Sequence, residues 1–249
     1  MTDALERMRR GLVVSVQAAP GSPLAVPEHL AAIARAVEAG GAVGIRTEGV
    51  ETIRAIREAV GLPVIGLIKR RTPGTEVYIT PDIADVLAVA EAGADLVAVD
   101  ATERPRADGA SGAEFVIAAA TELPGRILAD VDTASAGQAA AEAGAAAVAT
   151  TLSGYTGDET PVGPDLTLVA ELAQAVDVPV LAEGRFSTQE EVWAGLGAGA
   201  FAVVVGTAIT DPEALTRRSP RPPGDARWRP RRPGGRPPRR PPERPRCRA

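Results

Sequence analysis

The stretch Glu91-Ala92-Gly93-Ala94-Asp95-Leu96-Val97-Ala98-Val99-Asp100 joins the end of an alanine-rich helix to an apolar strand. Glycine after the last helical turn can adopt the left-handed conformation that ends a helix, and the strand then follows directly. Similar Gly-containing stretches, which also precede apolar runs, begin at Glu38, Glu142 and Gly197. This repetition indicates a chain built from helix-turn-strand units.

Eight apolar runs carry this pattern through most of the chain. They are continuous in Val, Ile, Leu and Ala rather than alternating with polar residues, as in strands that are buried on both faces of a parallel sheet. The expected strands are 12–18, 42–46, 64–69, 96–100, 126–130, 146–150, 178–182 and 202–205, with helical spacing in 50–60, 83–92, 134–143, 166–175 and 189–196. Eight such units predict an α/β fold, a (β/α)8 TIM barrel. An open doubly wound sheet is the alternative, but no Gly-x-Gly-x-x-Gly follows the first strand.

The two ends of the chain differ in charge. Residues 217–249 contain 13 Arg and two acids, so the rest keeps 14 of the 27 basic and 30 of the 32 acidic residues, a net charge of −16. We therefore expect a catalytic barrel domain over residues 1–218 and a disordered Arg/Pro-rich tail over 219–249. Such a tail could bind nucleic acid, but with Trp228 as its one aromatic residue it lacks an interleaved stacking pattern, and nucleic acid is not the expected partner.

Composition excludes several kinds of site. The single Cys247 and the single His29 rule out an intrachain disulfide and a zinc site built from Cys or His, and we expect no metal. No stretch approaches the roughly 18 apolar residues of a membrane span. Residues 1–10 are charged and lack the apolar core of a signal peptide, so the expected location is the cytoplasm, with no membrane contact.

Lys69 is the one lysine in the chain, and it closes the apolar run 64–69. Arginine cannot lose its proton in a protein, whereas lysine can once burial disfavours its charge. Catalytic groups of barrel enzymes lie at the C-terminal ends of strands. Lys69 is therefore a candidate base.

Other polar residues also stand at expected strand ends: Gln17, Arg46, Asp100, Asp130, Thr150, Glu183 and Gly206-Thr207. Among these, Glu183 is a candidate acid. Glu183-Gly184-Arg185 and Gly206-Thr207-Ala208 follow the seventh and eighth strands, where barrels often bind phosphate through backbone N–H groups. The pair of loops predicts a phosphorylated substrate.

Several of these segments resemble the N-acetylmannosamine-6-phosphate 2-epimerase family. The similarity runs in order from about residue 11 to 216 and is carried by 17–24, 44–46, 66–70, 76–81, 100–105, 129–130, 150–156, 182–185 and 205–210. The resemblance implies a TIM-barrel isomerase, N-acylglucosamine-6-phosphate 2-epimerase, which interconverts N-acetylmannosamine 6-phosphate and N-acetylglucosamine 6-phosphate in amino-sugar catabolism without a cofactor. The assembly stays open, with a homodimer as one expectation.

The resemblance also implies roles for individual residues. Lys69 corresponds to the catalytic lysine and Glu183 to the catalytic carboxylate. The remaining positions bind the substrate: Gln17, Arg46 and Asp130 at the sugar, and Gly184, Arg185, Gly206 and Thr207 at the phosphate. Asp211 departs from the pattern, because the family often carries Arg there.

The chemistry of the residues fits this reaction. Inversion at C2 needs removal of a proton next to the aldehyde of the open sugar, which a neutral lysine can accomplish. Two other classes stay open: an aldolase that forms a Schiff base on Lys69, and a non-enzymatic protein that binds nucleic acid through the tail.

Overall fold

The computed structural model describes residues 1–157 and 161–218. The predicted tail at 219–249 lies outside the described residues, so its disorder stays a prediction. In the described part the chain forms a closed barrel in which each strand pairs in parallel with its neighbours in sequence, and β8 closes onto β1. This confirms the (β/α)8 barrel and excludes the open sheet.

The strands lie close to the predicted runs. They are β1 (Leu12–Val16), β2 (Gly44–Glu48), β3 (Val64–Leu67), β4 (Leu96–Asp100), β5 (Ile127–Asp130), β6 (Ala147–Ala149), β7 (Val180–Glu183) and β8 (Ala202–Val205). The largest displacement is in β2, which begins and ends two residues later than predicted. That shift brings Glu48 into the strand.

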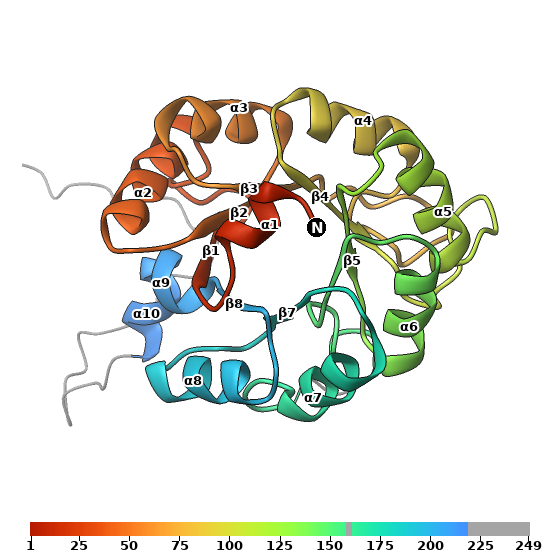
Figure 1. The fold of residues 1–249 in the computed structure, drawn as a ribbon. Coiled ribbons are helices and arrows are strands. Elements are labelled where there is room, and N and C mark those ends of the chain that lie inside the picture. Colours follow the sequence, from red (N-terminus) through yellow and green to blue (C-terminus); the bar gives the residue numbers. More distant parts are fainter. Residues whose placement is uncertain (158–160, 219–249) are drawn as a thin grey trace, which may run out of the picture.

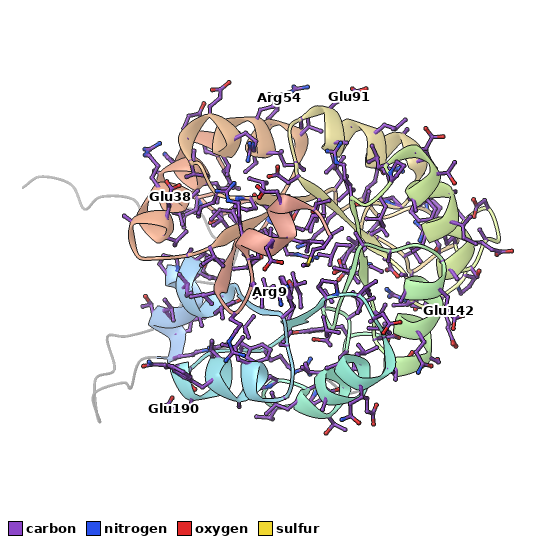
Figure 2. The ribbon with its side chains drawn as sticks, viewed as in Figure 1. Arg9, Glu38, Arg54, Glu91, Glu142 and Glu190 are labelled. Carbon is purple, nitrogen blue, oxygen red and sulfur yellow. The ribbon has the colours of Figure 1, made fainter. Side chains whose placement is uncertain are left out.

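Helices surround the barrel as a ring (Figure 1). They are α2 (Pro27–Ala39), α3 (Val50–Ala59), α4 (Ile83–Glu91), α5 (Gly112–Glu122), α6 (Ala134–Glu142), α7 (Leu166–Ala175) and α8 (Gln189–Gly197), with α9 (Thr207–Thr210) and α10 (Pro212–Arg218) after β8. Four of the turns into strands contain glycines with positive φ, Gly41, Gly93, Gly144 and Gly199, as the repeated helix ends predict. Charged side chains such as Arg54, Glu91, Glu142 and Glu190 point outward from the ring (Figure 2).

Each strand buries both of its faces. One set of side chains, including Val14, Ile45 and Val97, packs under the helices, while the alternate set, including Val13, Ile65 and Leu128, fills the barrel. This two-sided burial explains why the strands read as continuous apolar runs. It also means that a polar residue on an interior position must lie near a mouth of the barrel or carry a partner.

A short helix, α1 (Asp3–Arg7), precedes the first strand and lies across the centre of the ring (Figure 1). Its Leu5 and the following Met8 are fully buried and belong to the interior cluster of the barrel. Because this helix precedes β1, it covers the end of the barrel opposite to the predicted site. This helix was not expected from the sequence pattern.

Candidate active site

A cavity of about 1000 Å³ opens at the C-terminal ends of the strands. Eight of the nine predicted site residues line it: Gln17, Arg46, Lys69, Glu183, Gly184, Arg185, Gly206 and Thr207. They come from β1, β2, β3, β7 and β8 or the loops that directly follow these strands. The barrel thus brings together residues that are far apart in the sequence, at the mouth where barrel enzymes carry their chemistry.

Lys69 lies just beyond β3 and is fixed along its backbone. The Arg70 N–H donates to the Tyr78 carbonyl at 2.9 Å and the Thr80 N–H donates to the Ile68 carbonyl at 2.6 Å, which pairs Lys69 with Ile79 in an antiparallel bridge. These bonds continue the extended chain past the end of the strand. The side chain therefore keeps the interior-facing direction of Leu67, two residues earlier.

Two acceptors contact the Lys69 amine. Its Nζ donates to Gln17 Oε1 at 2.5 Å and lies 3.3 Å from Glu48 Oε2 in an ion pair. The Lys69 side chain is 39% exposed. The sequence led us to expect a buried lysine, and the side chain is less buried than that. Its position at the mouth is nevertheless set by three neighbouring strand ends.

A buried network of charges lies deeper in the barrel and is centred on Arg46. The Arg46 guanidinium donates to both carboxylate oxygens of Asp130, at 3.0 and 2.6 Å, and its Nη1 lies 3.1 Å from Glu183 Oε2. The Thr151 hydroxyl contacts Asp130 Oδ1 at 2.6 Å and Glu183 Oε2 at 3.2 Å. One cation is thus shared by two carboxylates, so this cluster has a net negative charge when both are ionised.

Burial and the neighbouring charges both shift the pKa values of Glu183 and Arg46. Burial raises the pKa of Glu183 above its ordinary value, with Asp130 acting in the same direction, and this outweighs the lowering effects of Arg46, Thr151 and Lys69. Burial alone would lower the pKa of Arg46, but Asp130 and Glu183 hold that pKa above its ordinary value. Arg46 therefore stays charged, while Glu183 takes up a proton more readily than an exposed glutamate.

The predicted phosphate end combines the loop after β7 with α9. Gly184 and Arg185 have φ angles of 117° and 62°, and a left-handed conformation is costly for a residue with a side chain. Arg185 is held by donating to the carbonyls of Gly163 and Ser153, both at 2.5 Å. Gly206 caps the N-terminus of α9, and a short extra helix of this kind forms part of the phosphate site in many barrels.

Asp130 is the predicted site residue that does not line the cavity. It is fully buried at the end of β5, behind Arg46 and Thr151. Its direct contact with a sugar stays a prediction, and its observed contacts orient Arg46.

Two other polar residues at strand ends have structural partners. Asp100 is fully buried and pairs with Arg104 at 2.6 Å. The Thr150 hydroxyl donates to the Glu183 carbonyl at 2.8 Å and accepts from the Glu183 N–H at 3.0 Å.

Glu48 also lines the cavity, although it was not among the predicted site residues. The expected strand stopped at Arg46, although Glu48 lies two residues further on and so faces the same side of the strand. That spacing of two was the signal that could have identified it.

Within residues 1–157 and 161–218, no group of three or more His, Cys, Asp or Glu side chains is arranged to hold a metal ion.

None of the helices described between residues 1 and 218 is both long and apolar enough to cross a bilayer.

A family model described as "Putative N-acetylmannosamine-6-phosphate epimerase" matches residues 30–220. Two bacterial proteins named "Putative N-acetylmannosamine-6-phosphate 2-epimerase" are among the similar relatives. The one from Caldanaerobacter subterraneus subsp. tengcongensis is 46% identical over 218 residues, covering 87% of this chain and 92% of that protein. The one from Escherichia coli O157:H7 is 46% identical over 200 residues, covering 80% and 86%.

A solved structure gives an independent comparison of the fold. The N-acetylmannosamine-6-phosphate 2-epimerase from Clostridium perfringens superposes with a TM-score of 0.82 and 37% sequence identity, over 87% of this chain and 95% of that chain. The family match, the relatives and this structure agree with one another. The chain belongs to the N-acetylmannosamine-6-phosphate 2-epimerase family.

Proposed function

We propose that this protein is an isomerase, an N-acylglucosamine-6-phosphate 2-epimerase that interconverts N-acetylmannosamine 6-phosphate and N-acetylglucosamine 6-phosphate. The observation that carries the proposal is the joint placement of Lys69 and Glu183 on the wall of one cavity, beside two loops suited to phosphate. Membership of the family supports the same substrate pair. As the substrate is a small phosphosugar, we place the reaction in the cytoplasm.

Lys69 acts as the base in this proposal. In the open-chain sugar the C1 aldehyde acidifies the hydrogen on C2. The Lys69 amine takes that proton, the C–H electron pair forms the C1–C2 double bond, and the aldehyde oxygen becomes an enolate oxygen. A proton that returns to C2 from the opposite face gives the epimer. No net oxidation or reduction occurs in these steps.

Glu183 and Arg46 act on the negative charge that develops on the substrate. Burial favours the protonated form of Glu183, so its carboxyl group can donate a proton during ring opening or reprotonation. Arg46 lines the cavity and stays positively charged, which stabilises the enolate oxygen. The contact between Arg46 and Glu183 at 3.1 Å couples these two groups.

The phosphate is held at the other side of the cavity, by the backbone around Gly184 and by Gly206 and Thr207 at the start of α9. Backbone N–H groups at this place in a barrel favour an anion. Binding the phosphate, which takes no part in the chemistry, positions C2 against Lys69.

Proton NMR of N-acetylmannosamine 6-phosphate in D2O tests the proposal. We expect loss of the C2 hydrogen signal together with appearance of N-acetylglucosamine 6-phosphate, both dependent on enzyme concentration. A folded protein that produces neither change would contradict the function.

Borohydride addition with substrate tests the Schiff-base alternative, since a stable adduct on Lys69 would support an aldolase instead. The family membership does not favour that alternative or the nucleic-acid one.

A further inference from the structure

Glu48 is a charged residue of the cavity wall to which the proposed mechanism gives no role. It ends β2 and is 33% exposed, and its Oε2 lies 3.3 Å from the Lys69 Nζ. An ion pair on a protein surface would contribute little, because water screens it.

The register of the strands indicates that the contact is built into the mouth of the barrel. In the pairing of β2 with β3, Arg46 lies opposite Ile65 and Glu48 opposite Leu67, and both apolar partners belong to the barrel interior. Glu48 therefore projects on the interior side, above Arg46. Lys69 continues the same face of β3 two residues beyond Leu67.

The Lys69 side chain is held from two directions. Gln17, directly after β1, accepts a hydrogen bond from Nζ at 2.5 Å, and Glu48 attracts the same amine from β2. Gln17 is itself oriented, because its Nε2 donates to Ser15 Oγ at 2.9 Å. A lysine has a flexible four-carbon stem, so contacts with two partners restrict where the amine can lie.

The charge of Glu48 matters most after the proton has moved. The form of Lys69 that reacts is the neutral amine. When this amine takes the C2 proton it becomes an ammonium ion, the form that pairs with Glu48, and a carboxylate 3.3 Å away attracts that ion more strongly than the neutral amine. An interaction that strengthens along the reaction lowers the barrier, whereas one of constant strength only tightens binding. The expected effect is therefore on kcat.

We propose that Glu48 is a positioning residue for Lys69, which holds the amine toward C2 and stabilises the ammonium ion formed by proton transfer. This inference rests on the proposed function for its kinetic consequence. Its structural consequence, a restrained Lys69 side chain, holds without substrate.

The kinetic test compares Glu48→Gln with Glu51→Gln. Glu51 on α3 also forms an ion pair, with Arg54 at 2.7 Å, but both partners are exposed on the outer surface, so it is the matched control. We expect Glu48→Gln to lower kcat for epimerisation by about 10- to 100-fold with KM within about two-fold, the size of effect that follows from small displacements of a catalytic group. Glu48→Asp, which keeps the charge, should recover part of that loss.

The structural test uses the single lysine of the chain. Labelling lysine with 13C at Cε gives one Lys69 signal, whose relaxation reports the mobility of the side chain. We expect this mobility to increase in Glu48→Ala and to be unchanged in Glu51→Gln. The measurement needs no turnover, and thermal unfolding shows whether each variant is folded.

The outcomes separate the two proposals. If the parent enzyme does not epimerise the phosphosugar, the proposed function fails, and unchanged Lys69 mobility in Glu48→Ala would then overturn the positioning role as well. If the parent is active but Glu48→Gln matches Glu51→Gln in kcat, only the role of Glu48 is overturned. A change confined to KM would also overturn it, because Glu48 would then act in substrate binding.

Discussion

Arg46 on β2 and Asp130 on β5 form a two-point ion pair across the interior of the barrel, with N–O distances of 3.0 and 2.6 Å. The two side chains are 2% and 0% exposed. Strands that are not neighbours in the sheet are thus joined beneath the cavity. The direction in which Arg46 presents its charge to the substrate depends on this pair.

Asp130→Asn should lower the free energy of unfolding by about 2–4 kcal/mol, because it leaves a buried guanidinium with Glu183 as its remaining carboxylate partner. Urea unfolding at pH 7 measures the change. Glu51→Gln, which removes an exposed ion pair, serves as the control and should cost at most about 1 kcal/mol. Equal losses in the two variants would show that the buried pair is no more important than the exposed one.

Gly66→Ala should destabilise the protein by about 1–3 kcal/mol through overpacking. A Cβ on Gly66 would lie 2.7 Å from Ala94 Cβ, 2.7 Å from Val89 Cγ1 and 2.8 Å from Ile53 Cδ1, under the helices that cover β3. Gly197→Ala at the end of α8 is the control, since an added Cβ there meets nothing within 4 Å. Thermal unfolding of both variants gives the comparison; a Gly66→Ala protein as stable as Gly197→Ala would contradict the packing around β3.

Lys69→Arg should fold and bind the phosphosugar but lose exchange of the C2 hydrogen with D2O. The guanidinium keeps its proton at any pH at which the enzyme works, and general-base catalysis is worth about 10² to 10⁴ in rate. Proton NMR follows the exchange directly, while calorimetric titration with substrate controls for binding. Exchange within a few-fold of the parent rate would mean that another group removes the proton.

The raised pKa of Glu183 predicts a dependence of stability on pH. A carboxyl group whose pKa is raised on folding binds its proton more tightly in the folded state, so stability falls as pH rises from about 4.5 through the raised value. Each tenfold gain in the proton affinity of this carboxyl group on folding corresponds to about 1.4 kcal/mol. Glu183→Gln should therefore lose less stability than the parent between pH 4.5 and 7.

Urea unfolding at a series of pH values measures this difference. A second contribution remains in the variant, because burial also raises the pKa of Asp100. For that reason the variant should show a reduced slope rather than a flat curve. Parallel curves for the parent and Glu183→Gln would indicate that Glu183 has an ordinary pKa.

N-acetylmannosamine without a phosphate should be a much poorer substrate than its 6-phosphate. One charge-assisted hydrogen bond contributes about 1.5–3 kcal/mol, which corresponds to about a 10- to 100-fold lower kcat/KM for each contact that the neutral sugar cannot make. The measurement is the ratio of kcat/KM values for the two sugars under the same conditions. Equal values would remove the role assigned to the loops at Gly184 and Gly206.

The barrel could be predicted from sequence because each strand is apolar on both faces and each helix end carries its own turn. β4 and β8 have the predicted bounds. Prediction failed where tertiary contacts decide the structure. α1 has five residues and little apolar character, and it is ordered because Leu5 and Met8 enter the barrel. The bridge between Lys69 and Ile79 depends on pairing outside any regular strand.

The candidate site shows the same division between local and tertiary information. The position of Gln17, Lys69 and Glu183 at the mouth of the barrel could be predicted because each follows or ends an apolar run. Glu48 was missed because Arg46-Thr47-Glu48 is too polar to read as a continuation of a buried strand. Thr47 is nevertheless fully buried in β2, and its hydroxyl donates to the Val16 carbonyl at 2.8 Å. The depth of Asp130 could not be predicted, since it depends on Arg46 reaching across the barrel.

The first helix has a consequence for substrate entry and product release. With Leu5 and Met8 filling the end of the barrel opposite the cavity, the described residues leave the mouth above the strands as the route to Lys69. Substrate and product must then enter and leave through the same mouth of the barrel. Because both epimers bind in this one cavity, we expect each to compete with the other for it, so that the product of either direction slows the reaction as it accumulates.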